Sequence, residues 1–584
     1  MPGAMSGRRG SGRFVRETGL SLFPMKKLRW QILVVVVTLV VVGVLLLTQQ
    51  PGPVFAPKPT AGGIYTEALI GSMSRLNPLI DQNNAPDRDI DRLIFSGLIK
   101  FDARGLPVPD LADSWGVRPD GTAYNFSIRP DALWQDGQPV TSDDVIFTLD
   151  LIKSDASLFP EDVRNMWKEV QVKKLNDRTL QFILPEPFAP FLDYLTFGLL
   201  PKHLLESTPP DQMAAAPFNL APVGTGPYRF ERLIVENGQV KGIELRASDQ
   251  YYGKKPFIEQ IIFHYYSSSA AALDAYHQGQ VLGISEITPD VLQQALSEPN
   301  LSLYTGRLPE LSLILFNLNN AEVPFLQDAK LRRALMMALN RQMIVNKFLQ
   351  GQAILADGPL FPNTWAYYDN IEHVGYDPEG AIALLKANGY KIPAGGSGVR
   401  VNKDGKSLEL TLVYPDDSLH TAIAELIQQN WATVGLKVDL EAVPYDTLRN
   451  DRLDPRAYHA ALVDLNLVRL PDPDPYPFWH QSEATGGQNY TQWDNRPASE
   501  YIEQARVNTD FEARTRLYRN FQVVFAKELP ALPLYYPVYS YGVDRQVLGV
   551  QMPPLFDTSD RFLTISDWFL VTRRSLESTA QPTP

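Results

Sequence analysis

The sequence predicts a mixed α/β protein with at least two compact lobes. The chain has 584 residues, whereas a single hydrophobic core rarely extends beyond about 250–300 residues. Within Leu98–Leu149, patterns typical of strands lead directly into a pattern typical of a helix. Hydrophobic residues make up 44% and charged residues 21% of the chain, as in ordinary globular proteins.

The first part of this stretch predicts a β-hairpin. Asp120-Gly121 is a turn dipeptide, and the apolar residues that follow alternate with polar ones. The alternating apolar residues are Tyr124, Phe126 and Ile128. We therefore expect a strand with one buried face.

Two helices are predicted from capping and spacing. After a second turn at Asp136-Gly137, Thr141 and Asp144 have the spacing of a weak capping box at the start of an amphipathic helix. Further along, Leu331, Leu335 and Leu339 repeat at i, i+4 and i+8 and predict another helix with one apolar side.

The N-terminal segment predicts export. Residues 1–31 are basic, with Glu17 as their only acid, and this asymmetry places the N-terminus in the cytoplasm. A transmembrane or signal helix is expected at 32–48, followed by a Pro-rich linker at 49–61. The apolar run Ile32–Leu47 spans about 24 Å as a helix, short of the roughly 30 Å of a hydrocarbon core. A retained anchor is favoured, and a signal cleaved near Val54–Ala56 stays open, as does initiation at Met1 or Met25.

Charge and composition exclude several classes. The net charge of −12 opposes binding of nucleic acid, and the absence of cysteine removes disulfides and thiolate metal sites. The chain lacks a nucleophile elbow, a zinc-protease helix and a phosphate loop; Gly405 is predicted to lie in a hairpin turn. We expect no catalytic residue, no metal site and no cofactor, so the protein is predicted not to be an enzyme.

A series of motifs resembles one family in its order along nearly the whole chain. Besides the hairpin stretch, the motifs are Leu76-Asn77-Pro78-Leu79, Gly224-Thr225-Gly226-Pro227-Tyr228, Asp472-Pro473-Asp474-Pro475 and Leu532-Pro533-Leu534-Tyr535-Tyr536. Together they resemble the family 5 extracellular solute-binding proteins, the peptide- and oligopeptide-binding branch that serves ABC importers.

The resemblance implies a two-lobed, periplasmic-binding-protein-like (class II) clamp with an inserted subdomain. Lobe I would comprise 62–94, 221–308 and 533–570, the inserted subdomain 95–220 and lobe II 309–532, with a disordered tail at 571–584. The two lobes, joined by two chain crossings, would close around a peptide or oligopeptide-like solute. The expected partners are ABC permease subunits, with the ATPase on separate chains, and the protein is expected to be a monomer at the extracytoplasmic face of the membrane, or secreted if the helix is cleaved.

The resemblance also points to ligand-binding residues. The family pairs an aspartate, three residues before the Asp-Pro motif, with the α-ammonium of the peptide. This chain has Arg469 there when counted from Asp472 and Pro471 when counted from Asp474, so neither register supplies the acid. Asp464 or Asp472 could take over the amine, Arg469 could hold a carboxylate with its guanidinium, or Arg469 could simply be solvated.

Aromatic and amide side chains complete the predicted site. The candidates are Trp365, Tyr368, Asn489, Tyr490 and Tyr536. Core packing is the more common explanation for aromatic residues such as these, whereas Asn489 and Tyr490 could add hydrogen bonds, and Trp431 is assigned to the core. An oligosaccharide or another non-peptide solute on the same scaffold is the alternative function. A sensor ectodomain or an enzyme is a remote one.

Overall fold

The computed structural model describes residues 33–40, 55–102, 104–159, 161–362, 364–396, 398–467 and 472–576. The chain divides into two units, 1–58 with 572–584, and 59–571. In the first unit, residues 33–40 are helical, and β1 (Phe55–Thr60) pairs with β20 (Val571–Leu576). Within the described ranges, every helix is too short or too polar to cross a bilayer.

Two expectations for the chain ends differ from the structure. The predicted linker 49–61 contains β1, and the predicted disordered tail from residue 571 begins with β20. Their pairing satisfies backbone groups that an isolated extended segment would leave to water. The basic segment 1–31, most of the predicted helix 32–48 and residues 577–584 lie outside the described residues.

A twelve-stranded sheet is the framework of the unit 59–571. Its main path is β17 (Lys437–Val443), β16 (Glu409–Pro415), β18 (Ala460–Asn466), β14 (Glu310–Phe316), β19 (Ala531–Asp544), β12 (Gly283–Ile284), β2 (Ile64–Ile70), β11 (Gln260–Tyr266), β10 (Gln239–Ala247) and β9 (Tyr228–Glu236). Strands β13 (Leu301–Arg307) and β15 (Ala353–Leu355) also pair with β19.

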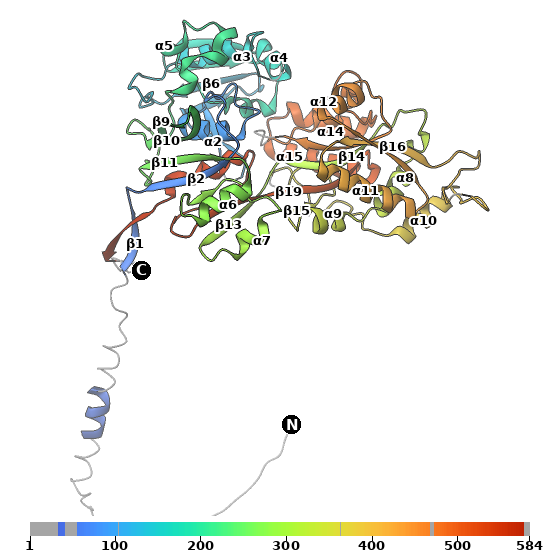
Figure 1. The fold of residues 1–584 in the computed structure, drawn as a ribbon. Coiled ribbons are helices and arrows are strands. Elements are labelled where there is room, and N and C mark those ends of the chain that lie inside the picture. The colour runs from blue at the N-terminus through green and yellow to red at the C-terminus, as the bar shows by residue number, and fades with distance from the viewer. Residues whose placement is uncertain are drawn as a thin grey trace, which may run out of the picture. The chain divides into compact units, whose positions relative to one another are not determined.

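Strand β19 belongs to both halves of this sheet. Its first residues pair with β14, where Tyr535 lies opposite Ser312, and its last residues pair with β13, where Asp544 lies opposite Leu301. Only residues 308 and 309 separate β13 from β14. The chain therefore passes between the halves in two paired antiparallel segments, β13–β14 and β19, which we call the crossing segments (Figure 1).

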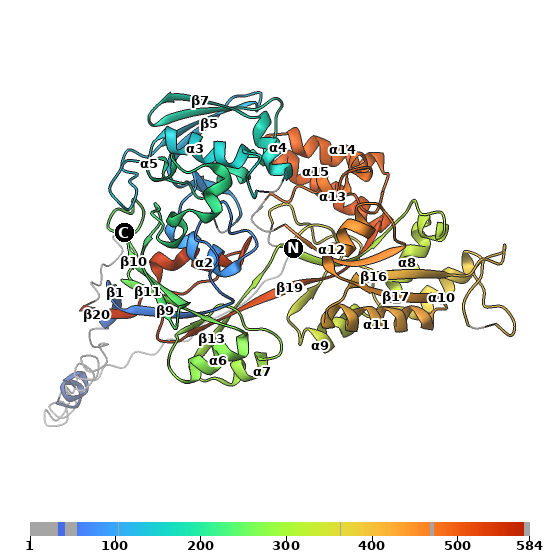
Figure 2. The ribbon, with the colours of Figure 1, turned by 45° about the horizontal axis from the view of Figure 1, so that its top comes forward.

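The predicted hairpin is confirmed in a four-stranded antiparallel sheet. Its order is β5 (Ala112–Val117), β6 (Ala123–Ile128), β8 (Thr179–Ile183) and β7 (Gln171–Asn176), and a small separate pair joins β3 (Ile99–Phe101) to β4 (Pro107–Pro109). On β6, Tyr124, Phe126 and Ile128 are buried whereas Asn125 is exposed, as the alternation predicts. Figure 2 shows β5, β7 and α3 (Ser142–Lys153) grouped at one end of the unit.

Both predicted helices are also confirmed. At the start of α3, Thr141 and Asp144 make the capping box in both directions. Helix α8 (Ala329–Met337) begins at the N-cap Asp328 and buries Leu331 and Leu335. Trp431 is fully buried, and its indole N–H donates to the Leu335 carbonyl at 2.9 Å.

Three large hydrophobic clusters hold the unit 59–571 together. The first joins β2, β11 and the inserted elements, and the other two cover opposite faces of the sheet around β14. Ile314 and Phe316 point into the second cluster, whereas Leu313 and Leu315 point into the third, because side chains alternate along a strand. The predicted boundaries of the lobes and of the subdomain stay predictions.

The other helices cover these sheets. They are α2 (Ala85–Ile94), α4 (Glu161–Glu169), η1 (Ala189–Leu195), α5 (Lys202–Leu205), η2 (Pro210–Ala215), η3 (Pro217–Leu220), α6 (Ser269–His277), α7 (Leu292–Ser297), η4 (Pro324–Gln327), α9 (Arg341–Phe348), α10 (Pro378–Ala387), α11 (Ser418–Thr433), α12 (Tyr445–Thr447), η5 (Leu448–Leu453), α13 (Tyr476–Trp479), η6 (Gln481–Ala484), α14 (Arg496–Val507), α15 (Phe511–Glu528) and η7 (Thr558–Asp567).

Candidate functional site

A group of carboxylates lies beside the crossing segments, where β14 begins and β18 ends. In this antiparallel pair Glu310 is opposite Asn466, and Ser312 is opposite Asp464. Directly opposed residues and alternate residues of a strand share one face of a sheet. The side chains of Glu310 and Asp464 therefore lie on the same face, the one that also carries Ile314 and Phe316.

Helix α11 adds a histidine and another carboxylate to this face. Asp417 caps the helix, accepting from the amide of His420 at 2.9 Å, and its other oxygen lies 2.5 Å from His420 Nδ1. Asp464 lies 3.0 Å from His420 Nε2. Burial opposes the charge of His420, but the bonds to the two carboxylates outweigh it and raise its pKa. We call Glu310, Asp417, His420 and Asp464 the acidic face.

Glu310 is the carboxyl group of the acidic face whose pKa is raised far above its usual value. Burial is the larger cause and the charge of Asp464 the smaller cause that raise the pKa of Glu310 to about 7, whereas the charge of His420 opposes this rise. Glu286, which follows β12, acts in the same direction as Asp464. A cation placed beside Glu310 would lower this pKa and ionise the carboxyl group. The acidic face can thus accept a positively charged group.

Asp472, the second predicted amine partner, is neutralised within the protein. It is buried, and one of its oxygens lies 2.6 Å from the Arg514 guanidinium. Arg514 also donates to the Ala505 carbonyl at 2.8 Å and lies 4.9 Å from the ring centre of Trp365. The structure thus brings two predicted residues, Trp365 and Asp472, to the same guanidinium.

Two predicted ligand residues are buried and bonded internally. The Asn489 amide donates to the carbonyls of His480 and Trp493, and its oxygen accepts from Thr491 and Trp493. The Tyr536 hydroxyl lies 2.9 Å and 2.8 Å from the carbonyl oxygens of Gly358 and Leu360. Both side chains are fully buried, so in this structure they hold loops in place.

Tyr368 and Tyr490 are partly exposed, and each ring lies under an arginine. Arg519 is 5.5 Å from the centre of Tyr368, and Arg456 is 4.8 Å from that of Tyr490, whose hydroxyl donates to Asp454 at 3.1 Å. Arg469 lies outside the described residues.

Three members of the acidic face, Glu310, Asp417 and His420, were missed from the sequence. Glu310 stands at the start of an otherwise apolar strand, and His420 follows Asp417 by three residues, the spacing at which an N-cap acid meets a side chain of the first turn. These signals mark each residue alone. Their meeting with Asp464 depends on the pairing of β14 with β18.

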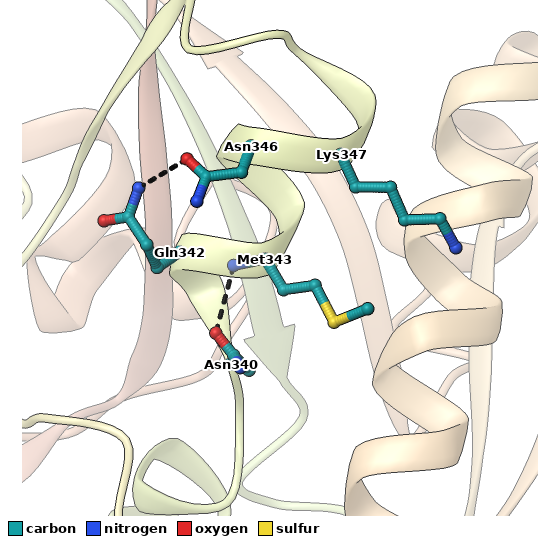
Figure 3. Close-up of a pocket in the computed structure, with 5 residues that line it drawn as sticks. All are labelled: Asn340, Gln342, Met343, Asn346 and Lys347. Atoms are coloured by element: carbon teal, nitrogen blue, oxygen red, sulfur yellow. Dashed lines mark hydrogen bonds between the residues drawn. The ribbon is translucent and has the colours of Figure 1, made fainter.

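Two depressions lie away from these residues. One, of about 430 Å³, is lined by Asn340 and four residues of α9, and Figure 3 shows that all five side chains come from this single helical segment. The other, of about 260 Å³, is lined by Asn320, Glu322, Thr411, Val413, Glu441, Ala457, Tyr458 and His459. Neither contains a predicted ligand residue.

Two halves of mixed α/β structure, joined by two paired crossing segments, define the two-lobed binding proteins. Residues 107–488 match the family model described as bacterial extracellular solute-binding proteins, family 5. The chain belongs to this family.

Curated relatives and solved structures agree with this assignment. The chain is 26% identical to the dipeptide-binding protein of Escherichia coli, over 85% of this chain and 94% of that protein. It is 27% identical to the oligopeptide-binding protein AppA of Bacillus subtilis, over 88% and 93%. The structure of AppA with a nonapeptide matches with a TM-score of 0.67 at 25% identity, over 88% of this chain and all of that one. The structure of NikZ from Campylobacter jejuni with Ni(L-His) matches with a TM-score of 0.66 at 26% identity, over 88% and 100%.

Proposed function

We propose that this protein is the extracytoplasmic solute-binding component of an ABC importer and captures a peptide or oligopeptide-like solute between its two lobes. The observation that carries the proposal is the pair of crossing segments, which join two separately cored halves of one sheet. A solute that contacts both halves binds the closed form more tightly than the open form, and it therefore shifts the equilibrium toward the closed form. The relatives named for dipeptides and oligopeptides support a peptide as the solute.

The closed protein would deliver its solute to the permease subunits of the importer, while ATP hydrolysis belongs to separate chains. We propose that the protein acts as a monomer, with lobe I at 62–94, 221–308 and 533–570, the inserted subdomain at 95–220 and lobe II at 309–532. The basic segment and the apolar run before residue 49 support a tether at the membrane, with the protein on its outer side.

We propose the acidic face as the partner of the peptide's α-ammonium. Of the two acids that the sequence offered for this role, Asp472 is paired with Arg514, whereas Asp464 shares its face with Glu310. His420 neutralises only part of the negative charge of Glu310 and Asp464. An ammonium group beside these two carboxylates would neutralise more of it. Trp365, Tyr368 and Tyr490 remain candidates for contacts with the side chains of the peptide.

Isothermal titration calorimetry with a tripeptide and its N-acetylated form tests this proposal. The free tripeptide should bind, and acetylation should weaken binding at least tenfold because it removes the ammonium charge. In Asp464→Asn the two forms should bind more equally, whereas the exposed control Asp131→Asn should keep the difference. Tight binding of the acetylated form by the wild type would contradict the role of the acidic face, and the absence of binding to any peptide would contradict the peptide assignment.

A non-peptide solute is the second candidate. The structural match to NikZ, whose structure holds Ni(L-His), supports it because the same fold there carries a metal–amino acid complex. Mass spectrometry of the solute that co-purifies with the protein separates the two candidates: a peptide favours the first, and a sugar or a metal complex the second.

A further inference from the structure

A second contact joins the predicted inserted subdomain to the predicted lobe II. Asp193, on η1, accepts a hydrogen bond from the backbone amide of Asp472 at 2.5 Å. Both residues are buried, with 8% and 7% of their surfaces exposed. Elsewhere in the same two parts of the chain, Gly121 approaches Thr509 so closely that a Cβ at position 121 would lie 3.0 Å from the Thr509 methyl group. The two segments are therefore in contact at more than one point.

Among the residues that the structure describes at this contact, three carboxylates (Asp193, Asp472 and Asp474) face two guanidinium groups. Arg514 pairs with Asp472 at 2.6 Å, and Arg506 pairs with Asp474 at 3.0 Å. Among the described residues, Asp193 has no ion pair, and its side chain has the Asp472 amide as its hydrogen-bond donor. The second oxygen of Asp472 is also buried, and it has no hydrogen-bond partner among the described residues. A proton on Asp193 would reduce the repulsion between these two carboxyl groups.

The surroundings of Asp193 favour that proton. Burial is the largest cause that raises the pKa of Asp193 well above its usual value, and the charge of Asp472 is the second largest. The bond from the Asp472 amide and the charge of Arg514 oppose this rise without cancelling it. The charged groups that act on Asp193 are Asp472 and Asp474, from the segment before α13, and Arg514, from α15. These groups interact in turn with Arg506 of α14, Tyr518 of α15 and Tyr124 of β6.

We propose that the contact between Asp193 and Asp472 belongs to the closed form of the two lobes, and that Asp193 is a positioning residue that makes closure depend on protons. The closed form holds a proton on the Asp193 carboxyl group, and opening returns it to water. The proposal rests on the two-lobed closure proposed above. It adds a control of solute affinity by a residue that touches Asp472 rather than the acidic face.

The sign of the effect follows from the direction of the shift. In the open form Asp193 would face water and titrate near its ordinary pKa of about 3.9. Between that value and the raised pKa of the closed form, the closed form binds one more proton. The ratio of closed to open molecules should therefore fall about tenfold for each unit of pH rise in this interval and level off outside it.

Distance measurements between two spin labels test this dependence. Because the chain has no cysteine, labels can be placed through Lys173→Cys on β7 and Val523→Cys on α15, both at exposed positions. Without added solute, from about pH 4 to about pH 9, the fraction of short distances should fall with rising pH. Asp193→Asn should remove the dependence, since an amide accepts the same hydrogen bond but does not ionise, and Asp131→Asn should retain it.

An unchanged pH dependence in Asp193→Asn, or a closed fraction that rises with pH, would overturn the proposal. Hydrogen exchange of the Asp472 amide in the wild type gives a second measurement, independent of any variant's folding. Its protection should fall with pH beyond the intrinsic change in exchange rate, and constant protection would contradict the proposal. Neither measurement uses a solute or an importer. A result against the proton dependence of closure can therefore be distinguished from a result against peptide binding.

Discussion

Replacement of Arg561 should destabilise the protein strongly, because this residue is a buried cation between two buried carboxylates. Its guanidinium lies 2.6 Å and 2.8 Å from the Asp89 oxygens and 2.7 Å from a Glu67 oxygen. Arg561, Glu67 and Asp89 are 1%, 0% and 4% exposed. Removal of one partner from a buried ion pair costs about 3–5 kcal/mol because it leaves an uncompensated charge. We expect Arg561→Met to lower the free energy of unfolding by about this amount.

Two further variants separate charge from packing. Adding Glu67→Gln and Asp89→Asn to Arg561→Met should recover most of the loss, because neutral amides need no cation. Arg104→Met is the exposed control: Arg104 pairs with Asp102 but its side chain is 75% exposed, so we expect a loss below about 1 kcal/mol. Urea unfolding followed by tryptophan fluorescence measures all three. A loss below about 1 kcal/mol in Arg561→Met, or no recovery in the triple variant, would refute the reasoning.

Three other predictions concern binding and stability. Ammonium binding requires ionised Glu310, whose pKa is about 7, so calorimetry should show the peptide affinity falling as the pH drops below 7. Glu310→Gln should bind the peptide more weakly and without this pH dependence, and equal pH profiles of the two proteins would exclude Glu310 as an ammonium partner. Asp144→Ala removes the acceptor of the Thr141 and Lys202 amides and should cost about 1–2 kcal/mol in urea unfolding. Asp143→Ala removes only a partly exposed ion pair with Lys174 and should cost under about 0.5 kcal/mol. Asn489→Ala leaves buried backbone groups unpaired and should cost about 2–3 kcal/mol; weakened peptide binding at unchanged stability would instead make Asn489 a ligand residue.

The local elements could be predicted from the sequence because their signals are local. The Asp120-Gly121 turn and the alternation after it predicted β6, and the Thr141–Asp144 spacing predicted the capping box of α3. Turn and capping preferences act between residues a few positions apart, so a single sequence displays them. Gly405 likewise adopts the positive φ, 78°, of a turn.

The site could be predicted only in part because its contacts are nonlocal. Asp464 was a candidate, but its place beside Glu310 follows from the register between β14 and β18, which no local pattern displays. Asp472 was also a candidate, and its pairing with Arg514 depends on the position of α15. Asn489 had the polarity of a ligand residue, and only the structure shows that its amide is buried and donates to the His480 and Trp493 carbonyls.

Strand β19 has a consequence for the order of events when the chain folds. It supplies Tyr539 and Tyr541 to the first hydrophobic cluster, Leu532 and Leu534 to the second and Tyr536 to the third. Since it lies close to the C-terminus, none of the three cores is complete until nearly the whole polypeptide has been synthesised. A nascent chain that ends before residue 531 lacks these side chains, so we expect all three clusters to be incompletely packed in it.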